Sequence, residues 1–167
     1  AVMVLEPSPR VTEDRPPAPE DVAAAREFVR GLRTTLRSAD GTEPASFDTT
    51  LAELNATMKL GTRFVRGFRG DMQLIEDGVE GHASVPIRIG EATQWLNVTL
   101  AAPEFDGDFR LSRAQLGPLD LSPDFALASL RIGANMVFGN GLGDQVVGAA
   151  SRMQIRGEEL SFVMEMD

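Results

Sequence analysis

The feature that most constrains the fold is a long region in which apolar and polar residues alternate. From about residue 71, apolar residues recur at every second position. The clearest run places Ala83, Val85, Ile87 and Ile89 on one face, opposite His82, Ser84, Pro86 and Arg88. Leu96, Val98 and Leu100 repeat the pattern, and Phe109 and Leu111 continue it. This period, interrupted by glycine-containing turns, predicts four strands in an antiparallel meander with one buried face.

An almost wholly apolar segment follows, from residue 123 to residue 138. Ser122 is suited to cap this helix, and Pro123 to occupy its first turn. Apolar side chains this widely distributed are typical of a helix buried on nearly all sides. The alternative is a helix that lines a groove for an apolar ligand or lies against a partner. In that case the ligand-binding residues are expected to be Phe125, Leu127, Leu130, Met136 and Phe138.

The remaining patterns predict helices at about 19–38, 50–60 and 145–150, a short strand at 44–48, and two closing strands joined at Gly157. The first helix has an apolar stripe that includes Leu32 and Leu36. Thr49 or Thr50 is expected to cap the second helix, and Glu53 lies three residues after Thr50, as in a capping box. The predicted fold class is α+β. A curved antiparallel sheet, made of the meander and a carboxy-terminal hairpin, wraps around helices or packs on them.

Residues 19–167 are expected to form one α+β domain, and the proline-rich residues 1–18 an extended tether. Residues 1–5 are all apolar. They are either a processed or cloned end, or the remainder of a removed membrane anchor.

Composition excludes several classes of function. The 167 residues carry a formal net charge of −9, which disfavours nucleic-acid binding. Without cysteine, the chain has no disulfide, thiolate metal site or cysteine nucleophile. His82 is the only histidine, and its position in the alternation predicts an exposed or partly exposed strand residue. We therefore predict no catalytic residue, no metal site and no cofactor.

Residues 63–69 form a basic and aromatic island in this acidic chain. Arg63, Arg66 and Arg69 lie next to Phe64, Val65 and Phe68. Three arginines this close together can bind anionic lipid head groups or an acidic partner. Ordinary ion pairing with the acidic excess is the competing interpretation.

Three short motifs resemble a group of bacterial membrane-anchored envelope domains, the YpmS-like proteins. They are Thr50-Leu51-Ala52-Glu53-Leu54-Asn55, Trp95-Leu96-Asn97 and the segment from Leu116 to Pro123. The resemblance covers about residues 20–167. It implies a single amino-terminal membrane anchor outside this chain and a periplasmic or otherwise extracytoplasmic soluble domain. It brings no catalytic residues with it.

The expected function is therefore that of a non-enzymatic envelope domain, which binds an apolar ligand, a lipid or a protein partner. The alternative is a hydrolase with a dispersed carboxylate pair, as in glycoside cleavage.

Overall fold

The alternating segments form the larger of two antiparallel sheets. The computed structural model describes residues 4–39, 43–139 and 141–166. Its larger sheet has the order β3-β4-β5-β7-β8, and β1 pairs with β5. The strands are β1 (Leu5–Glu6), β3 (Arg69–Ile75), β4 (Gly78–Ile89), β5 (Ala92–Pro103), β7 (Arg113–Leu116) and β8 (Leu119–Asp120).

The smaller sheet joins the closing hairpin to two segments from earlier in the chain. Its order is β2-β10-β9-β6. The strands are β2 (Ala45–Thr50), β6 (Phe105–Asp106), β9 (Ala150–Arg156) and β10 (Glu159–Met164). The turn between β9 and β10 contains Gly157, whose φ of 63° favours glycine. The predicted α+β class is confirmed, with the strands divided between two sheets.

The β4–β5 hairpin is the longest element of the fold. Its register runs from Gly78↔Pro103 to Ile89↔Ala92 without a shift, so β4 contains no bulge toward β5. On the other side of β4, strand β3 begins at Arg69, opposite Ser84. The outer part of the hairpin therefore projects beyond β3, and Pro86 lies in this part, where a residue without an N–H is tolerated.

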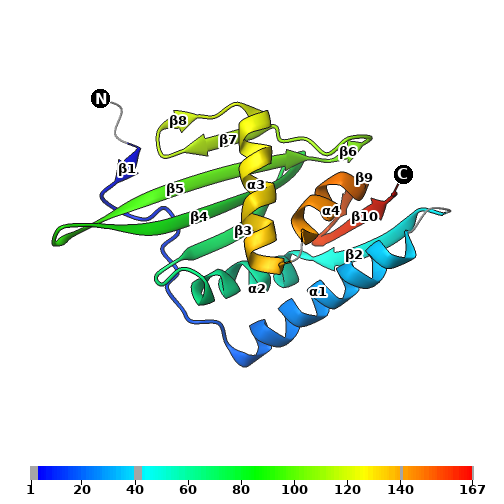
Figure 1. Ribbon diagram of the computed structural model, residues 1–167, viewed down its shortest axis with the longest axis horizontal. Coiled ribbons are helices and arrows are strands. Elements are labelled where there is room, and N and C mark those ends of the chain that lie inside the picture. The colour runs from blue at the N-terminus through cyan, green and yellow to red at the C-terminus, as the bar shows by residue number, and fades with distance from the viewer. Residues whose placement is uncertain (1–3, 40–42, 140, 167) are drawn as a thin grey trace.

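Four α-helices are described, and they cover one side of this framework (Figure 1). They are α1 (Pro19–Ser38), α2 (Leu51–Lys59), α3 (Pro123–Phe138) and α4 (Leu142–Ala149). Helix α3 crosses the larger sheet, whereas α1 lies along β2 and α2. Among the described residues, no helix combines the length and apolar character needed to span a membrane.

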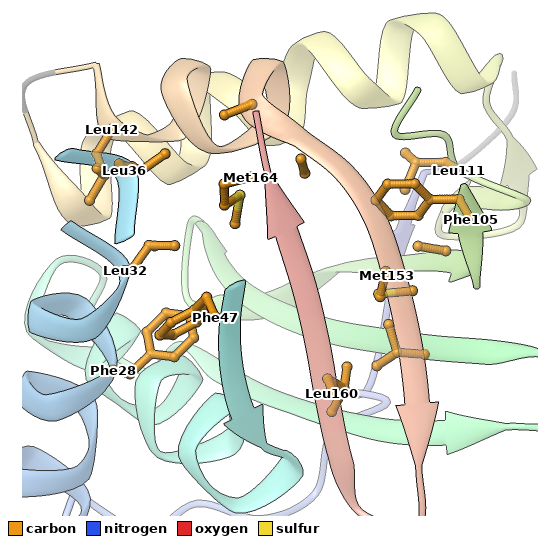
Figure 2. Close-up of a cluster of buried hydrophobic side chains, with 14 of the residues drawn as sticks. Phe28, Leu32, Leu36, Phe47, Phe105, Leu111, Leu142, Met153, Leu160 and Met164 are labelled. Carbon is orange, nitrogen blue, oxygen red and sulfur yellow. The ribbon is translucent and has the colours of Figure 1, made fainter. Parts of the chain in front are cut away.

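The main core lies between the two sheets and against α1 and α4 (Figure 2). Helix α1 buries the stripe that its sequence predicted, including Phe28, Leu32 and Leu36. Phe28 packs edge-on against Phe47 of β2, with 5.5 Å between ring centroids. Met153 and Leu160 bring β9 and β10 into the same core.

The prediction of a fourth meander strand at residues 109–111 is wrong. Strand β6 pairs with β9 of the smaller sheet, with Phe105 opposite Met153. The chain must then cross back between the sheets before β7 joins β5. Phe109 and Leu111 lie in this crossing and pack on the core, so their alternation reflects burial rather than strand pairing. The short helix predicted at 145–150 begins earlier, at Leu142.

Thr50 joins the smaller sheet to α2, because it ends β2 and caps the helix. Its hydroxyl oxygen accepts a hydrogen bond from Glu53 N at 3.2 Å, and the Glu53 carboxylate accepts from Thr50 N at 3.3 Å. This is the capping box that the sequence predicted.

Removing this cap tests its contribution to stability. We expect Thr50→Ala to lower the free energy of unfolding by about 1 kcal/mol, measured by urea denaturation. Thr34→Ala, at an exposed position within α1, is the matched control and should cause no loss. Equal losses in the two variants would contradict a capping role for Thr50.

Candidate functional site: an apolar cavity between the two sheets

An apolar cavity of about 230 Å³ lies between the larger sheet and the elements that cover it. It is lined by residues of β3, β4 and β5 on one side, of β9 and β10 on the other, and by α2 and α3. His82 is the one polar residue among those lining it, and its ring makes its hydrogen bonds on the opposite face of the sheet. The cavity therefore offers van der Waals contact rather than hydrogen bonds.

Small residues on the apolar face of the hairpin leave this space open. Gly81 and Ala83 of β4 and Ala102 of β5 line the cavity between larger neighbours. A Cβ atom added at Gly81 would meet nothing closer than Met72, at 3.9 Å, which is ordinary contact distance. The space next to Gly81 is therefore unoccupied, and there is room for a side chain at this position.

Helix α3 contributes to the cavity through one face. Leu130 lines the cavity, and Leu127 packs on the adjoining core. Phe125 points to solvent and is 61% exposed, as is Ile132 at 63%. The helix is thus not buried on all sides. The structure brings Leu127 and Leu130 to the interior but not Phe125, and the side chains of Met136 and Phe138 lie outside what is described.

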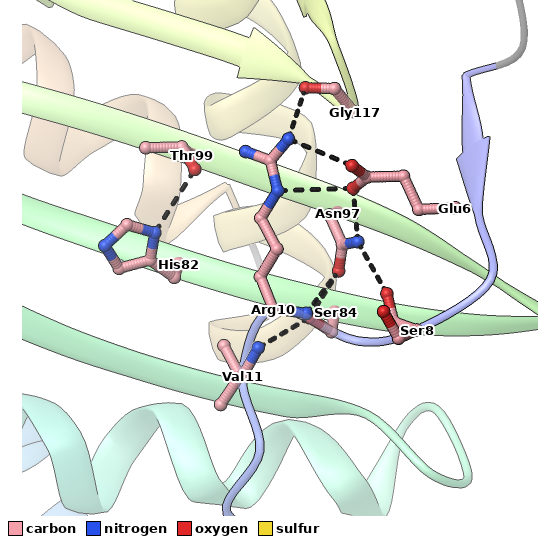
Figure 3. Close-up of polar contacts among 9 residues, drawn as sticks. All are labelled: Glu6, Ser8, Arg10, Val11, His82, Ser84, Asn97, Thr99 and Gly117. Carbon is pink, nitrogen blue, oxygen red and sulfur yellow. Dashed lines mark hydrogen bonds and ion pairs between the residues drawn. The ribbon is translucent and has the colours of Figure 1, made fainter.

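The opposite face of the larger sheet is polar and is covered by the amino-terminal segment (Figure 3). Ser84 of β4 and Asn97 of β5 are fully buried there. Asn97 Oδ1 accepts hydrogen bonds from Ser84 Oγ at 2.6 Å and from Arg10 N at 3.0 Å. Its Nδ2 donates to Glu6 Oε2 at 2.5 Å and to Ser8 O at 3.1 Å.

The segment that was predicted as an extended tether is therefore held to the sheet between Glu6 and Val11. Val11 N donates to Ser84 Oγ at 3.1 Å, and the Arg10 guanidinium donates to Gly117 O at 2.9 Å. Further along, Asp14 pairs with Arg69 at 3.1 Å. Residues far apart in the sequence thus meet on this face, with Asn97 at the centre.

A second, polar cleft of about 320 Å³ lies beside this segment, around His82. His82 Nε2 lies 2.9 Å from Glu80 Oε1, and its Nδ1 lies 3.2 Å from Thr99 Oγ1. Because an ionised carboxylate only accepts, the hydrogen on Nε2 points to Glu80, and Nδ1 lies within hydrogen-bond distance of the Thr99 hydroxyl. His82 is half-buried on β4, in agreement with the partly exposed strand residue that the pattern allowed, and it has defined partners.

This order of carboxylate, imidazole and hydroxyl is the one that hydrolases use to move a proton. Here Thr99 is buried in the middle of a strand, and the buried Glu80 also forms an ion pair with Arg113. Gln73 Nε2 donates to the same carboxylate at 3.1 Å. The buried Glu80 carboxylate is therefore paired with Arg113, His82 and Gln73, since a buried charge is costly to leave unpaired.

The three arginines of the basic island lie in two different environments. Arg63 and Arg66 are exposed in the loop between α2 and β3. Arg69, in contrast, is the first residue of β3; it lies over the Trp95 ring at 4.7 Å and pairs with Asp14. Arg69 thus fixes the amino-terminal segment, and only Arg63 and Arg66 face outward from this loop.

Comparisons with known proteins add no family: no family model, no curated protein and no solved structure matches the chain. The resemblance to YpmS-like domains thus stays a prediction. Within the described residues, no group of three or more histidine, aspartate or glutamate side chains could hold a metal ion.

Sequence reasoning predicted an apolar ligand site beside the helix at 123–138, but it missed the residues of the sheet that line the cavity and the Ser84–Asn97 network. A signal for the cavity was present, because Gly81 and Ala83 are small residues on a face otherwise made of larger apolar side chains. For the network there was no local signal, since Asn97 and its partner Arg10 are separated by 87 positions.

Asn97 should be the residue on which docking of the amino-terminal segment depends most. Asn97→Ala removes the acceptor of Ser84 Oγ, one of the two acceptors of Arg10 N, and the donor to Glu6 and Ser8 O, so we expect a loss of about 2–3 kcal/mol in the free energy of unfolding. Faster amide exchange at Arg10 and Val11 should accompany it, measured by mass spectrometry. Gln94→Ala, at a half-buried position of the same strand, is the control. Unchanged exchange in Asn97→Ala would contradict the assignment.

Glu6 predicts a pH dependence for the same contact. Its pKa lies below the usual 4.5, chiefly because Asn97 donates a hydrogen bond to the carboxylate, with help from Arg10 and against the opposing effect of desolvation. Ionised Glu6 therefore stabilises the folded chain above about pH 4.5, and this contribution is lost as pH falls through the lowered folded-state pKa.

We expect Glu6→Gln to lower stability at neutral pH and to approach the parent chain at low pH, measured by denaturation between pH 7 and pH 3. In an Asn97→Ala background the pH dependence of this difference should shrink. A difference that is constant with pH in the parent chain would contradict the role assigned to Glu6.

Proposed function

We propose that this chain is a non-enzymatic binding domain whose cavity takes an apolar ligand. The observation that carries the proposal is the apolar space of about 230 Å³ between the β4–β5 hairpin and the smaller sheet. Folded interiors leave few voids larger than a water molecule, because a void forfeits dispersion contacts. A space this large, bordered by Gly81 and Ala83, supports a role in ligand binding.

The volume limits the size of the ligand. An apolar protein cavity of roughly 150 Å³ holds benzene, so a space of this volume corresponds to roughly nine carbon atoms. That is a medium-length alkyl chain or one small ring system. Burying eight or nine methylene groups contributes roughly 6–7 kcal/mol, which corresponds to a dissociation constant of roughly tens of micromolar.

The chemistry of the lining sets the class of ligand. A polar group placed among Leu100, Leu130 and Phe162 would lose its hydrogen bonds to water without replacement. The ligand is therefore a hydrocarbon portion, and any polar head group that it carries stays outside the cavity. This selects alkyl chains of lipids or similar molecules over sugars, nucleotides and peptides.

We place this binding domain in the bacterial envelope, on the extracytoplasmic side of a membrane to which an amino-terminal anchor outside this chain attaches it. The motifs shared with YpmS-like domains, Thr50–Asn55 and Trp95–Asn97, support this setting. An envelope protein is the other partner that this setting suggests. The hydrolase with a dispersed carboxylate pair stays the alternative prediction.

Filling the cavity from within tests the proposal. The parent chain is titrated calorimetrically with straight-chain alcohols from hexanol to dodecanol, and the affinity should rise with length and level off at about nine carbons. Gly81→Leu places a side chain into the space and should abolish binding. Ala83→Leu, which enters the same space from the next inward position of β4, should do the same.

The matched control adds the same side chain elsewhere. Ala128→Leu lies on the exposed side of α3 and should leave binding unchanged. All variants are checked by thermal melting, so that lost binding is separated from lost folding. No binding by the parent chain, or equal binding by Gly81→Leu, would refute the cavity as the ligand site.

A further inference from the structure

Two neighbouring loops at one end of the larger sheet share a distinctive composition. The first contains residues 63–66, between α2 and β3, and the second contains residues 88–91, at the turn between β4 and β5. We call these eight residues the basic tip. Figure 1 places both loops at the end of the molecule where the β4–β5 hairpin projects past β3 and α3.

The segments that carry the two loops approach each other closely at Gly67 and Pro86. Gly67, which follows the first loop, has a φ of 81°. A Cβ atom added there would lie 2.9 Å from Cγ of the Pro86 ring, two residues before the second loop. No side chain fits at Gly67, so the two segments lie against each other at the base of the loops.

Large apolar side chains concentrate on the basic tip. Phe64 is 56% exposed, Val65 37% and Ile89 55%. They are three of the six large apolar residues that are exposed among the described residues. Each lies in a turn or at the end of a strand, so the three protrude instead of lying in a flat patch.

The charge of the basic tip is opposite to that of the chain. Arg63, Arg66 and Arg88 are exposed, and Glu91 is the one acidic residue beside them. The chain as a whole carries −9. The net negative charge of the chain repels an anionic partner, and local positive charge at one surface offsets that repulsion. The basic tip therefore indicates an anionic partner.

The arginines of the basic tip also differ from the basic residues next to them. Arg10, Lys59 and Arg69 each form an ion pair with a carboxylate of this chain. Within the part of the chain that the structure describes, Arg63, Arg66 and Arg88 form none. Their charge is available to another molecule.

We propose that the basic tip docks on an anionic lipid bilayer. Phe64, Val65 and Ile89 enter the head-group layer, and the three arginines bind lipid phosphates. Protruding apolar side chains surrounded by arginines suit a lipid interface, because the head groups close around each of them. A stable protein interface needs about 800 Å² of complementary surface per partner, which three separate side chains do not supply.

This docking surface is separate from the apolar cavity and stands without it. It also gives the proposed binding domain an orientation relative to the membrane. The inward face of β4 continues from Ala83 at the cavity through Val85 and Ile87 to Ile89 at the basic tip. A docked domain would therefore present the apolar face of its hairpin next to the bilayer.

Vesicle binding tests the proposal with a reporter that the chain already has. Trp95 is the only tryptophan, and its register partner is Pro86, next to the basic tip. Energy transfer from Trp95 to a dansyl-labelled lipid should appear with phosphatidylcholine vesicles that contain about 25 mol% phosphatidylglycerol, and not with pure phosphatidylcholine. The transfer should fall as salt is raised to about 0.5 M.

Two kinds of variant separate the charged and apolar contributions. Arg63→Glu/Arg66→Glu should weaken binding about 25-fold or more, at about fivefold for each arginine. Phe64→Ser/Ile89→Ser keeps every charge and should also lose most of the binding. The matched controls are Arg26→Glu/Arg37→Glu on α1 and Phe125→Ser on α3, which lie outside the basic tip and should bind like the parent chain.

Thermal melting of each variant separates lost binding from lost folding. The proposal is overturned if the parent chain leaves both kinds of vesicle unbound, in which case a protein partner remains for the basic tip. It is also overturned if the α1 charge reversal weakens binding as much as the change at the tip, or if folded tip variants bind like the parent chain.

Discussion

The whole molecule depends on the two unlike faces of the β4–β5 hairpin. Along these strands, apolar side chains face the smaller sheet and polar side chains face the amino-terminal segment. Away from the exposed end of the hairpin, other parts of the chain pack on both faces. Helices α2 and α3 and the smaller sheet enclose the apolar face, and residues 6–11 cover the polar face. The candidate ligand site and the ordered amino-terminal segment are thus consequences of the same alternation.

Buried polar groups specify how the covering elements are placed. Apolar packing tolerates sliding, whereas a buried amide requires its partners in one arrangement. Asn97 fixes residues 6–10 on the sheet. Asn55 fixes α2 beside β3, because its side chain accepts from Met72 N at 2.7 Å and donates to Met72 O at 2.9 Å. Both asparagines thus hold elements together that are distant in the sequence.

Local chemistry made much of the fold predictable. The caps at Thr50 and Ser122 and the stripe on α1 depend on neighbours within four positions, and each was found where it was expected. The division into two sheets was not predictable, because Phe109 and Leu111 alternate equally well in a strand or in a buried crossing. The ligand residues expected on α3 were only partly placed at the cavity, since an apolar helix does not reveal which side faces a sheet. Gly81 and Ala83 carried the better signal.

The position of the amino-terminal segment sets an order of events during synthesis. Residues 6–11 leave the ribosome before the surface that binds them, because that surface needs Ser84, Asn97 and Gly117. They must therefore wait, unpaired, until about a hundred further residues have been made. Prolines at positions 7 and 9 suit that interval, because they keep the backbone extended and deny a growing β-sheet of another chain a full set of donors. This segment is thus synthesised before the sheet that it covers, and it takes its place after that sheet.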